Sequence, residues 1–107
     1  MSMNQVDQFF EAMVARFQPQ AAVDLDAVIQ YRLAEGESYY LTVSDQRCVL
    51  DRGEHGAPCV TLKMKFDTLQ KLGRGELDGM KAFMFGKLKV SGDMSLATRL
   101  AKLFPAG

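Results

Sequence analysis

The spacing of apolar residues switches from the period of a helix to that of a strand and back, and this pattern constrains the fold most strongly. Residues 6–17 carry apolar side chains three and four positions apart, which predicts an amphipathic helix. Asn4 is placed to cap that helix, Asp7 suits the positive end of its dipole, and Pro19 ends it. From residue 27 the period becomes two, which is typical of half-buried strands.

Alternation of apolar and polar residues predicts four consecutive strands in the middle of the chain. Their expected ranges are 27–33, 39–44, 47–51 and 59–64. Asp45-Gln46 forms a tight turn between the second and third strands, and the other connections are also brief. We therefore expect the four strands to form an antiparallel meander.

The last part of the chain returns to helices, with one more strand among them. Asp67 is the expected cap of a short helix at residues 68–72, and Asp78 is the expected cap of the next. Residues 87–91 alternate as a fifth strand, and Asp93 precedes a final helix whose leucines recur at three and four positions. The sequence thus predicts a single α+β domain over residues 1–107, with a five-stranded, largely antiparallel sheet covered on one face by helices.

Composition excludes several classes of protein. A chain of 107 residues, of which 48% are hydrophobic, has the size of one globular domain and is too apolar for a disordered tail. It has no apolar run long enough to cross a bilayer and no signal peptide pattern, so the cytoplasm is the expected location. Cys48 and Cys59 form no metal-binding pattern, and we expect both to be buried, reduced thiols.

The charges are balanced in total but unevenly distributed. Net charge is zero, which argues against a nucleic-acid partner. Residues 1–59 hold four Arg and nine Asp or Glu, whereas residues 60–107 hold nine Lys or Arg and four acids. Two interpretations remain open: a basic face that meets phosphates or an anionic membrane, or a fold in which the two halves interleave.

The sequence holds no recognisable catalytic arrangement. The single histidine, His55, lies in a loop between glycines, with no nucleophile paired to it in a known motif. Phosphate-binding and hydrolase motifs are also missing. We therefore expect no enzyme activity, no cofactor and no metal site.

The stretch AFMFGKLKVSGDMSLATRLAKLF, residues 82–104, is rich in aromatic, methionine and leucine side chains. Helical spacing alone favours an ordinary core. Methionine also adapts to apolar partners of varied shape, and short helices separated by glycine leave room for a cavity above a small sheet. The lysines of GKLK are open to two interpretations as well, the solvent face of an edge strand or a basic rim for phosphates.

Residues 73–100, GRGELDGMKAFMFGKLKVSGDMSLATRL, resemble the signature of the sterol carrier protein-2 family of lipid-binding domains. The matching positions are Ala82-Phe83, Gly86-Lys87-Leu88-Lys89, Gly92, Met94, Leu96-Ala97 and Leu100. Many members have Gln before the Gly-Lys-Leu-Lys, where this chain has Phe85, and the change removes a polar group. The short chain without a peroxisomal tail resembles the free-standing bacterial members.

The resemblance implies a hydrophobic tunnel between the sheet and the last helices. Its ligands would be fatty acids, acyl-CoA esters, phospholipids or isoprenoid lipids, with sterols less expected. The resemblance places Phe83, Met84, Leu88, Val90, Met94, Ala97 and Leu100 in its lining, and we expect Phe85 and Phe104 to belong to the ligand site as well. The basic rim, for head groups or a transiently bound anionic membrane, would consist of Lys81, Lys87 and Lys89.

The residues and the resemblance together favour a non-enzymatic protein that binds and transfers an elongated hydrophobic ligand. One alternative is an accessory domain that docks on, or presents lipid to, a biosynthetic enzyme such as one of quinone synthesis. In that case exposed apolar residues near Phe104 would form the interface. A third alternative is a structural domain of the same fold without a cavity.

Overall fold

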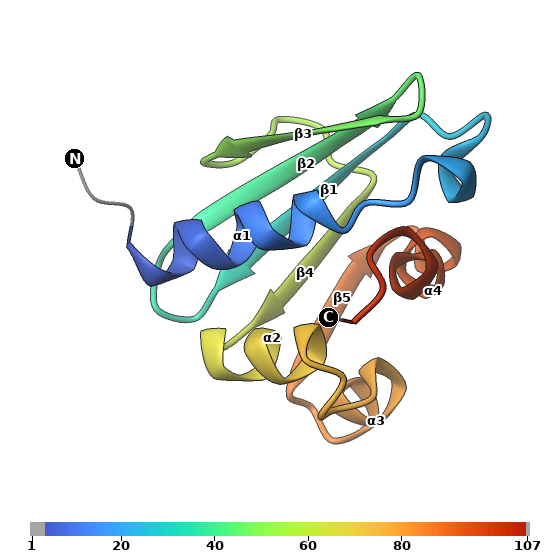
Figure 1. Cartoon of the computed structure of the whole chain (residues 1–107). Helices are drawn as coiled ribbons and strands as arrows, with labels where there is room; N and C mark the ends of the chain where they lie inside the picture. The colour runs from blue at the N-terminus through green and yellow to red at the C-terminus, as the bar shows by residue number, and fades with distance from the viewer. Residues whose placement is uncertain (1–3, 107) are drawn as a thin grey trace.

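The computed structural model describes residues 4–106 as a five-stranded sheet with helices packed against one of its faces (Figure 1). In chain order the elements are α1 (Gln5–Ala15), the 3-10 helix η1 (Pro19–Ala22), β1 (Ala27–Leu33), β2 (Ser38–Ser44), β3 (Arg47–Arg52), β4 (Val60–Met64), α2 (Phe66–Gly73), α3 (Gly79–Met84), β5 (Leu88–Gly92) and α4 (Met94–Leu103). The predicted α+β class, with a mostly antiparallel sheet, is confirmed.

The strand order β3-β2-β1-β4-β5 differs from the predicted meander. β1, β2 and β3 pair antiparallel as expected, and β5 pairs antiparallel with β4. β4, however, lies on the other side of β1 and runs parallel to it, with Ile29 opposite Val60 and Tyr31 opposite Leu62. The predicted meander is therefore wrong for the fourth strand, because periodicity specifies the buried face of a strand and not its neighbour.

A buried glutamine holds the segment that carries the chain from β3 to β4 across the outer face of the sheet. Gln30 of β1 is 2% exposed, although it points away from the helices. Its Nε2 donates to the carbonyl oxygens of Tyr39 (3.0 Å) and Gly53 (2.9 Å). Its Oε1 accepts from the backbone N–H of His55 (2.7 Å). Every polar atom of this amide is thus paired, as burial requires, and His55 belongs to the crossing segment.

Three of the four predicted N-caps are in place. Side-chain oxygens of Asn4, Asp78 and Asp93 accept from backbone N–H groups in the first turns of α1, α3 and α4, at 2.8, 2.9 and 3.1 Å. The predicted cap at Asp67 is wrong, because α2 begins before it. Asp67 lies instead in the first turn, where it complements the helix dipole and pairs with Lys71 at 3.3 Å.

Aromatic rings pack α1 against the first strands. The buried ring of Phe10 stacks on Tyr39, with 4.4 Å between centroids, and meets Tyr31 edge-on at 5.3 Å. Asp7 ties the start of α1 to the sheet by accepting from the hydroxyl of Tyr39 and the guanidinium of Arg52. The hydrogen bond from Tyr39, supported by Arg52, holds the pKa of the Asp7 carboxyl below its usual range.

Both cysteines are free, but they differ in exposure. Cys48 of β3 is half-buried, and burial raises the pKa of its thiol to about 11. Cys59 is exposed, contrary to the expectation that both are buried, because it lies in the crossing segment directly before β4.

Candidate functional site

A cavity of about 600 Å³ lies between the sheet and the helices. Its wall is formed by residues of β1, β4 and β5, of all the helices α1 to α4, and of the loops that join them. The lining residues are Phe9, Met13, Arg16, Tyr31, Leu62, Met64, Leu69, Leu72, Gly73, Gly75, Leu77, Asp78, Gly79, Met80, Phe83, Leu88, Val90, Met94, Ala97, Thr98, Leu100, Ala101, Phe104 and Ala106. Most of these side chains are apolar, and the volume is in the range of small-molecule sites.

The floor of the cavity consists of inward-facing residues on three neighbouring strands. Strand register places Leu62 and Met64 of β4 directly beside Val90 and Leu88 of β5. On the other side, Leu62 is the register partner of Tyr31 of β1. Because side chains alternate between the two faces of a strand, these five residues converge on the helix side of the sheet.

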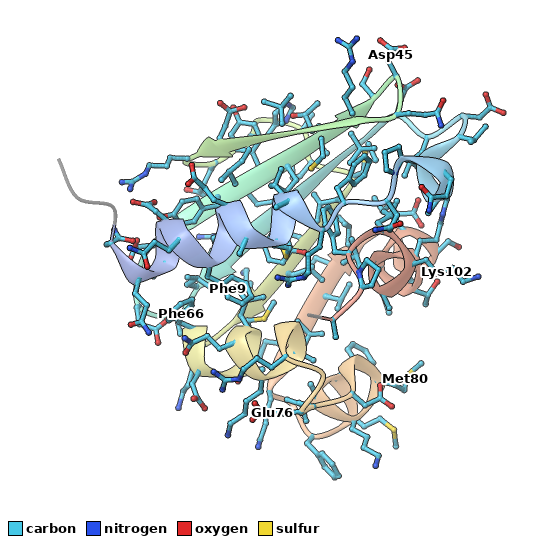
Figure 2. The ribbon with its side chains drawn as sticks, in the orientation of Figure 1. Phe9, Asp45, Phe66, Glu76, Met80 and Lys102 are labelled. Carbon is cyan, nitrogen blue, oxygen red and sulfur yellow. The ribbon has the colours of Figure 1, made fainter. Side chains whose placement is uncertain are left out.

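The wall opposite β5 is built where α1 meets α2. Phe9 and Phe66 point toward one another between the two helices (Figure 2), with their rings edge-on at 5.8 Å. Leu69 and Leu72 continue this wall along α2. Gly73 at the end of α2 permits the contact, because a Cβ there would lie 2.7 Å from the Phe9 ring.

Space remains above β4 and β5 because the helices on that side are short. α2 has eight residues and α3 has six, and both lie beyond the ends of the strands rather than across them (Figure 1). The loop between them turns at Gly75, whose φ of 75° is a conformation that favours glycine. The volume between these two helices and α4 therefore stays unfilled by side chains.

Seven of the nine residues predicted for the ligand site line the cavity: Phe83, Leu88, Val90, Met94, Ala97, Leu100 and Phe104. Met84 and Phe85 do not line it, and each is 73% exposed. Their expected place in the wall is wrong, because α3 buries Ala82 and a residue two positions later lies on the opposite side of a helix. Phe85 ends the helix and also stays outside.

The burial of Phe104 bears on the alternative of a docking domain. The docking alternative places exposed apolar residues near Phe104, but this side chain is buried. Its ring packs against Phe17 at 5.6 Å and lines the cavity. A backbone hydrogen bond from Gln18 to Leu103, at 2.9 Å, holds the end of α4 in this position.

Sequence reasoning missed the residues that α1 and α2 contribute to the cavity. The available signal was the pair of adjacent phenylalanines, Phe9 and Phe10, which widens the apolar stripe of α1 beyond one face. In the structure Phe10 enters the core and Phe9 lines the cavity. The pair therefore marks a helix with two different apolar neighbours.

A buried tyrosine is among the residues of this largely apolar wall. Tyr31 is 4% exposed, and its hydroxyl forms no hydrogen bond with another residue in the range 4–106. Tyr31 is one of the residues that line the cavity, so its phenol belongs to the few polar groups of the wall. Burial raises its pKa, so the phenol is neutral and is able to donate a hydrogen bond.

The cavity wall also holds a cation. Arg16 is half-buried and donates from Nε to the carbonyl oxygen of Pro105 at 3.0 Å, and from Nη1 to that of Ala12 at 3.4 Å. No carboxylate of the described residues forms an ion pair with it. Among residues 4–106 the positive charge of Arg16 is thus held in place without a counter-charge.

The three lysines predicted as a rim lie outside the lining of the cavity. Lys81, Lys87 and Lys89 are exposed and make no ion pair with any acid in the described part of the chain. Lys89 is the register partner of Lys63 and faces away from the cavity, because its neighbours Leu88 and Val90 face into it. Lys81 lies on α3, beside residues of the cavity wall.

The described residues contain no group of three or more His, Cys, Asp or Glu placed to hold a metal ion. Between residues 4 and 106, none of the helices has the length and apolarity needed to cross a membrane. A helix-covered sheet around a largely apolar cavity, with Arg16, Tyr31, Asp78 and Thr98 as the polar side chains in its lining, defines a binding domain for a small apolar molecule. The chain belongs to the SCP-2 sterol transfer family, whose profile matches residues 8–105.

Similar proteins include both much longer chains and chains of about this size. Over 80 residues the chain is 35% identical to hydroxysteroid dehydrogenase-like protein 2 of Bos taurus, covering 72% of this chain and 19% of that protein. The chain thus spans about a fifth of that relative's length. The fold superposes on the inverting sec-alkylsulfatase Pisa1 from Pseudomonas sp. with a TM-score of 0.86 at 22% identity, covering 94% of this chain and 16% of that chain. It superposes on palmitated SCP2L2 from Aedes aegypti with a TM-score of 0.72 at 25% identity, covering 91% of both chains.

Proposed function

We propose that the protein binds an elongated apolar ligand in the cavity and transfers it without chemical change. The observation that carries this proposal is the cavity itself, about 600 Å³ with a wall of apolar side chains from the sheet and from α1 to α4. Membership of the SCP-2 sterol transfer family supports it. The palmitated state of the Aedes aegypti relative supports an acyl chain as the ligand.

Apolar burial would supply most of the binding free energy. Each methylene group moved from water into the cavity contributes about 0.8 kcal/mol, so affinity should rise about fourfold per added methylene until the cavity is full. Ordering and association costs oppose this gain. Chain length should therefore govern affinity more than any other feature of the ligand.

Arg16 and Tyr31 support a polar head group at one end of the ligand. A carboxylate or phosphate would neutralise Arg16, and the hydroxyl of Tyr31 would donate to an oxygen of the ligand. Phe85 stands outside the cavity, so the exchange of Gln for Phe at that position leaves the polarity of this wall unchanged. A fatty acid should accordingly bind more tightly than its methyl ester.

The function is tested by identifying what the purified protein holds and what it takes up. Native mass spectrometry, followed by extraction, should show a stoichiometric acyl or isoprenoid adduct. In solution, unlabelled fatty acids should displace a fluorescent fatty acid with affinities that rise with chain length, and the methyl esters should displace it less well. A protein that carries no adduct and takes up no fluorescent fatty acid would refute the proposal.

The accessory-domain alternative remains a prediction that a lipid adduct alone does not decide. It requires a stable complex with a biosynthetic enzyme and exposed apolar residues near Phe104, a side chain that is itself buried. Transfer of labelled lipid between vesicles by the isolated chain would separate the two, because only a carrier performs it without the enzyme.

A further inference from the structure

Most of the large apolar side chains that are exposed within residues 4–106 lie together on α3. Met80, Phe83, Met84 and Phe85, which we call the α3 patch, account for four of seven such residues. Met84 and Phe85 contribute nothing to the core or to the cavity wall. A cluster of exposed apolar side chains marks a surface that meets another apolar body.

The segment that carries the α3 patch is basic throughout. Residues 79–92 contain Lys81, Lys87 and Lys89 and no Asp or Glu. None of these lysines forms an ion pair with an acid among the residues described. The acids that flank the segment, Asp78 and Asp93, accept hydrogen bonds as N-caps of α3 and α4. The segment that carries the apolar side chains thus holds three lysines that form no ion pair with a described acid.

The α3 patch is continuous with the cavity wall. Met80 and Phe83 are exposed to solvent and line the cavity as well. In Figure 2, Met80 projects from the side of α3 that faces away from α1. A molecule that leaves the cavity between these two side chains would therefore emerge directly at the patch.

We infer that the α3 patch docks on the surface of a bilayer that contains anionic lipids. Met84 and Phe85 enter the layer below the head groups, while the lysines of the same segment attract the lipid phosphates. A protein partner fits less well, because the contact surfaces of proteins are depleted in lysine. The inference rests on the proposed function, since docking at this place lets the ligand pass between cavity and bilayer without crossing water.

Vesicle sedimentation tests the contribution of each group. The chain should sediment with vesicles of phosphatidylcholine mixed with phosphatidylglycerol, and much less with phosphatidylcholine alone. Phe85→Ser and Met84→Ser should each weaken binding several-fold, whereas Val49→Ser, at an exposed valine of the opposite edge strand β3, should not. Lys87→Gln should weaken binding about fivefold and reduce its salt dependence. Arg47→Gln on β3 is the matched control for the charge.

Fluorescence reports the depth of insertion, because the chain has no tryptophan of its own. Phe85→Trp places a reporter in the α3 patch, and Val49→Trp places one on β3. With anionic vesicles the emission of Phe85→Trp should shift to shorter wavelength and should be quenched by lipids brominated on the acyl chain. The emission of Val49→Trp should not change.

Three results would overturn the inference: equal sedimentation with both kinds of vesicle, full binding by Phe85→Ser, or an unchanged Phe85→Trp spectrum. A wild-type chain that binds neither kind of vesicle would also overturn it, and would leave the α3 patch as a protein-docking surface. Displacement of the fluorescent fatty acid in the absence of vesicles tests the proposed function separately. Phe85→Ser should retain that displacement in full, because Phe85 does not line the cavity.

Discussion

Leu100 and Met84 show how different the environments of two similar residues are in this chain. Both are large, apolar and helical, and both belong to the stretch that the family resemblance places in the ligand site. Leu100 lines the cavity from α4, whereas Met84 is exposed on α3. Periodicity recognises both as apolar positions of a helix, but it does not distinguish a side chain facing a cavity from one facing solvent.

Filling the cavity at Leu100 should reduce ligand binding without unfolding the protein. In Leu100→Trp the larger ring would occupy space that the ligand needs, so the affinity for a fatty acid should fall at least about tenfold. Met84→Trp is the matched control, because its ring would lie outside the cavity and leave the affinity unchanged. Displacement of a fluorescent fatty acid measures the affinity, and thermal unfolding checks the fold. If Leu100→Trp binds as tightly as the wild type, Leu100 is ordinary core.

The strands and helices themselves were largely predictable from the sequence, whereas the order in which the strands pair in the sheet was not. Alternation identified β1 to β5, and side-chain chemistry identified the caps of α1, α3 and α4. β4 pairs parallel with β1, and the segment that leads to β4 is held by the buried amide of Gln30, far away in the sequence. A single polar residue within an alternating strand gives no sign of such a distant contact.

The junction between β4 and β5 should tolerate no side chain at Gly92. Gly92 has a φ of 99°, and a Cβ on it would lie 2.5 Å from the carbonyl oxygen of Cys59. We expect Gly92→Ala to lower the free energy of unfolding by about 2 kcal/mol or more, through backbone strain and this backbone clash. Gly56→Ala serves as control, because its Cβ would meet nothing within 4 Å. Urea unfolding measures both variants, and equal stabilities would contradict the expectation.

At the scale of the whole molecule, the helix-covered face of the sheet has two different halves: side chains fill the space over one half, and a cavity lies over the other. α1 packs aromatic rings on β1 and β2, whereas the space over β4 and β5 is the cavity. The sequence predicted that helices cover one face, and the family resemblance implied a tunnel under the last helices. Neither the sequence pattern nor the resemblance indicated that α1 and α2 complete the cavity wall, because residues of those helices also satisfy the pattern of ordinary core.

Bound ligand should therefore protect the half of the domain around the cavity from amide hydrogen exchange more than the half packed by α1. Without ligand, α2 and α3 rest on an unfilled space, so we expect them to open locally and exchange early. A fatty acid at 100 times its dissociation constant stabilises the folded state by about 2.7 kcal/mol. At short exchange times it should slow exchange in residues 66–104 and change little in residues 27–52. Mass spectrometry of peptides measures this, and equal slowing in both ranges would contradict it.

Four methionines, Met13, Met64, Met80 and Met94, come together in the cavity wall from four different elements. Methionine side chains are unbranched and adapt their shape at little energetic cost. A wall of this kind adapts its shape to the ligand and does not impose one shape on it. Cargo would therefore be sorted by how long it is and by what its head group carries, while kinks, double bonds and branches along the chain would count for little. The protein would gain breadth of cargo at the expense of fine discrimination.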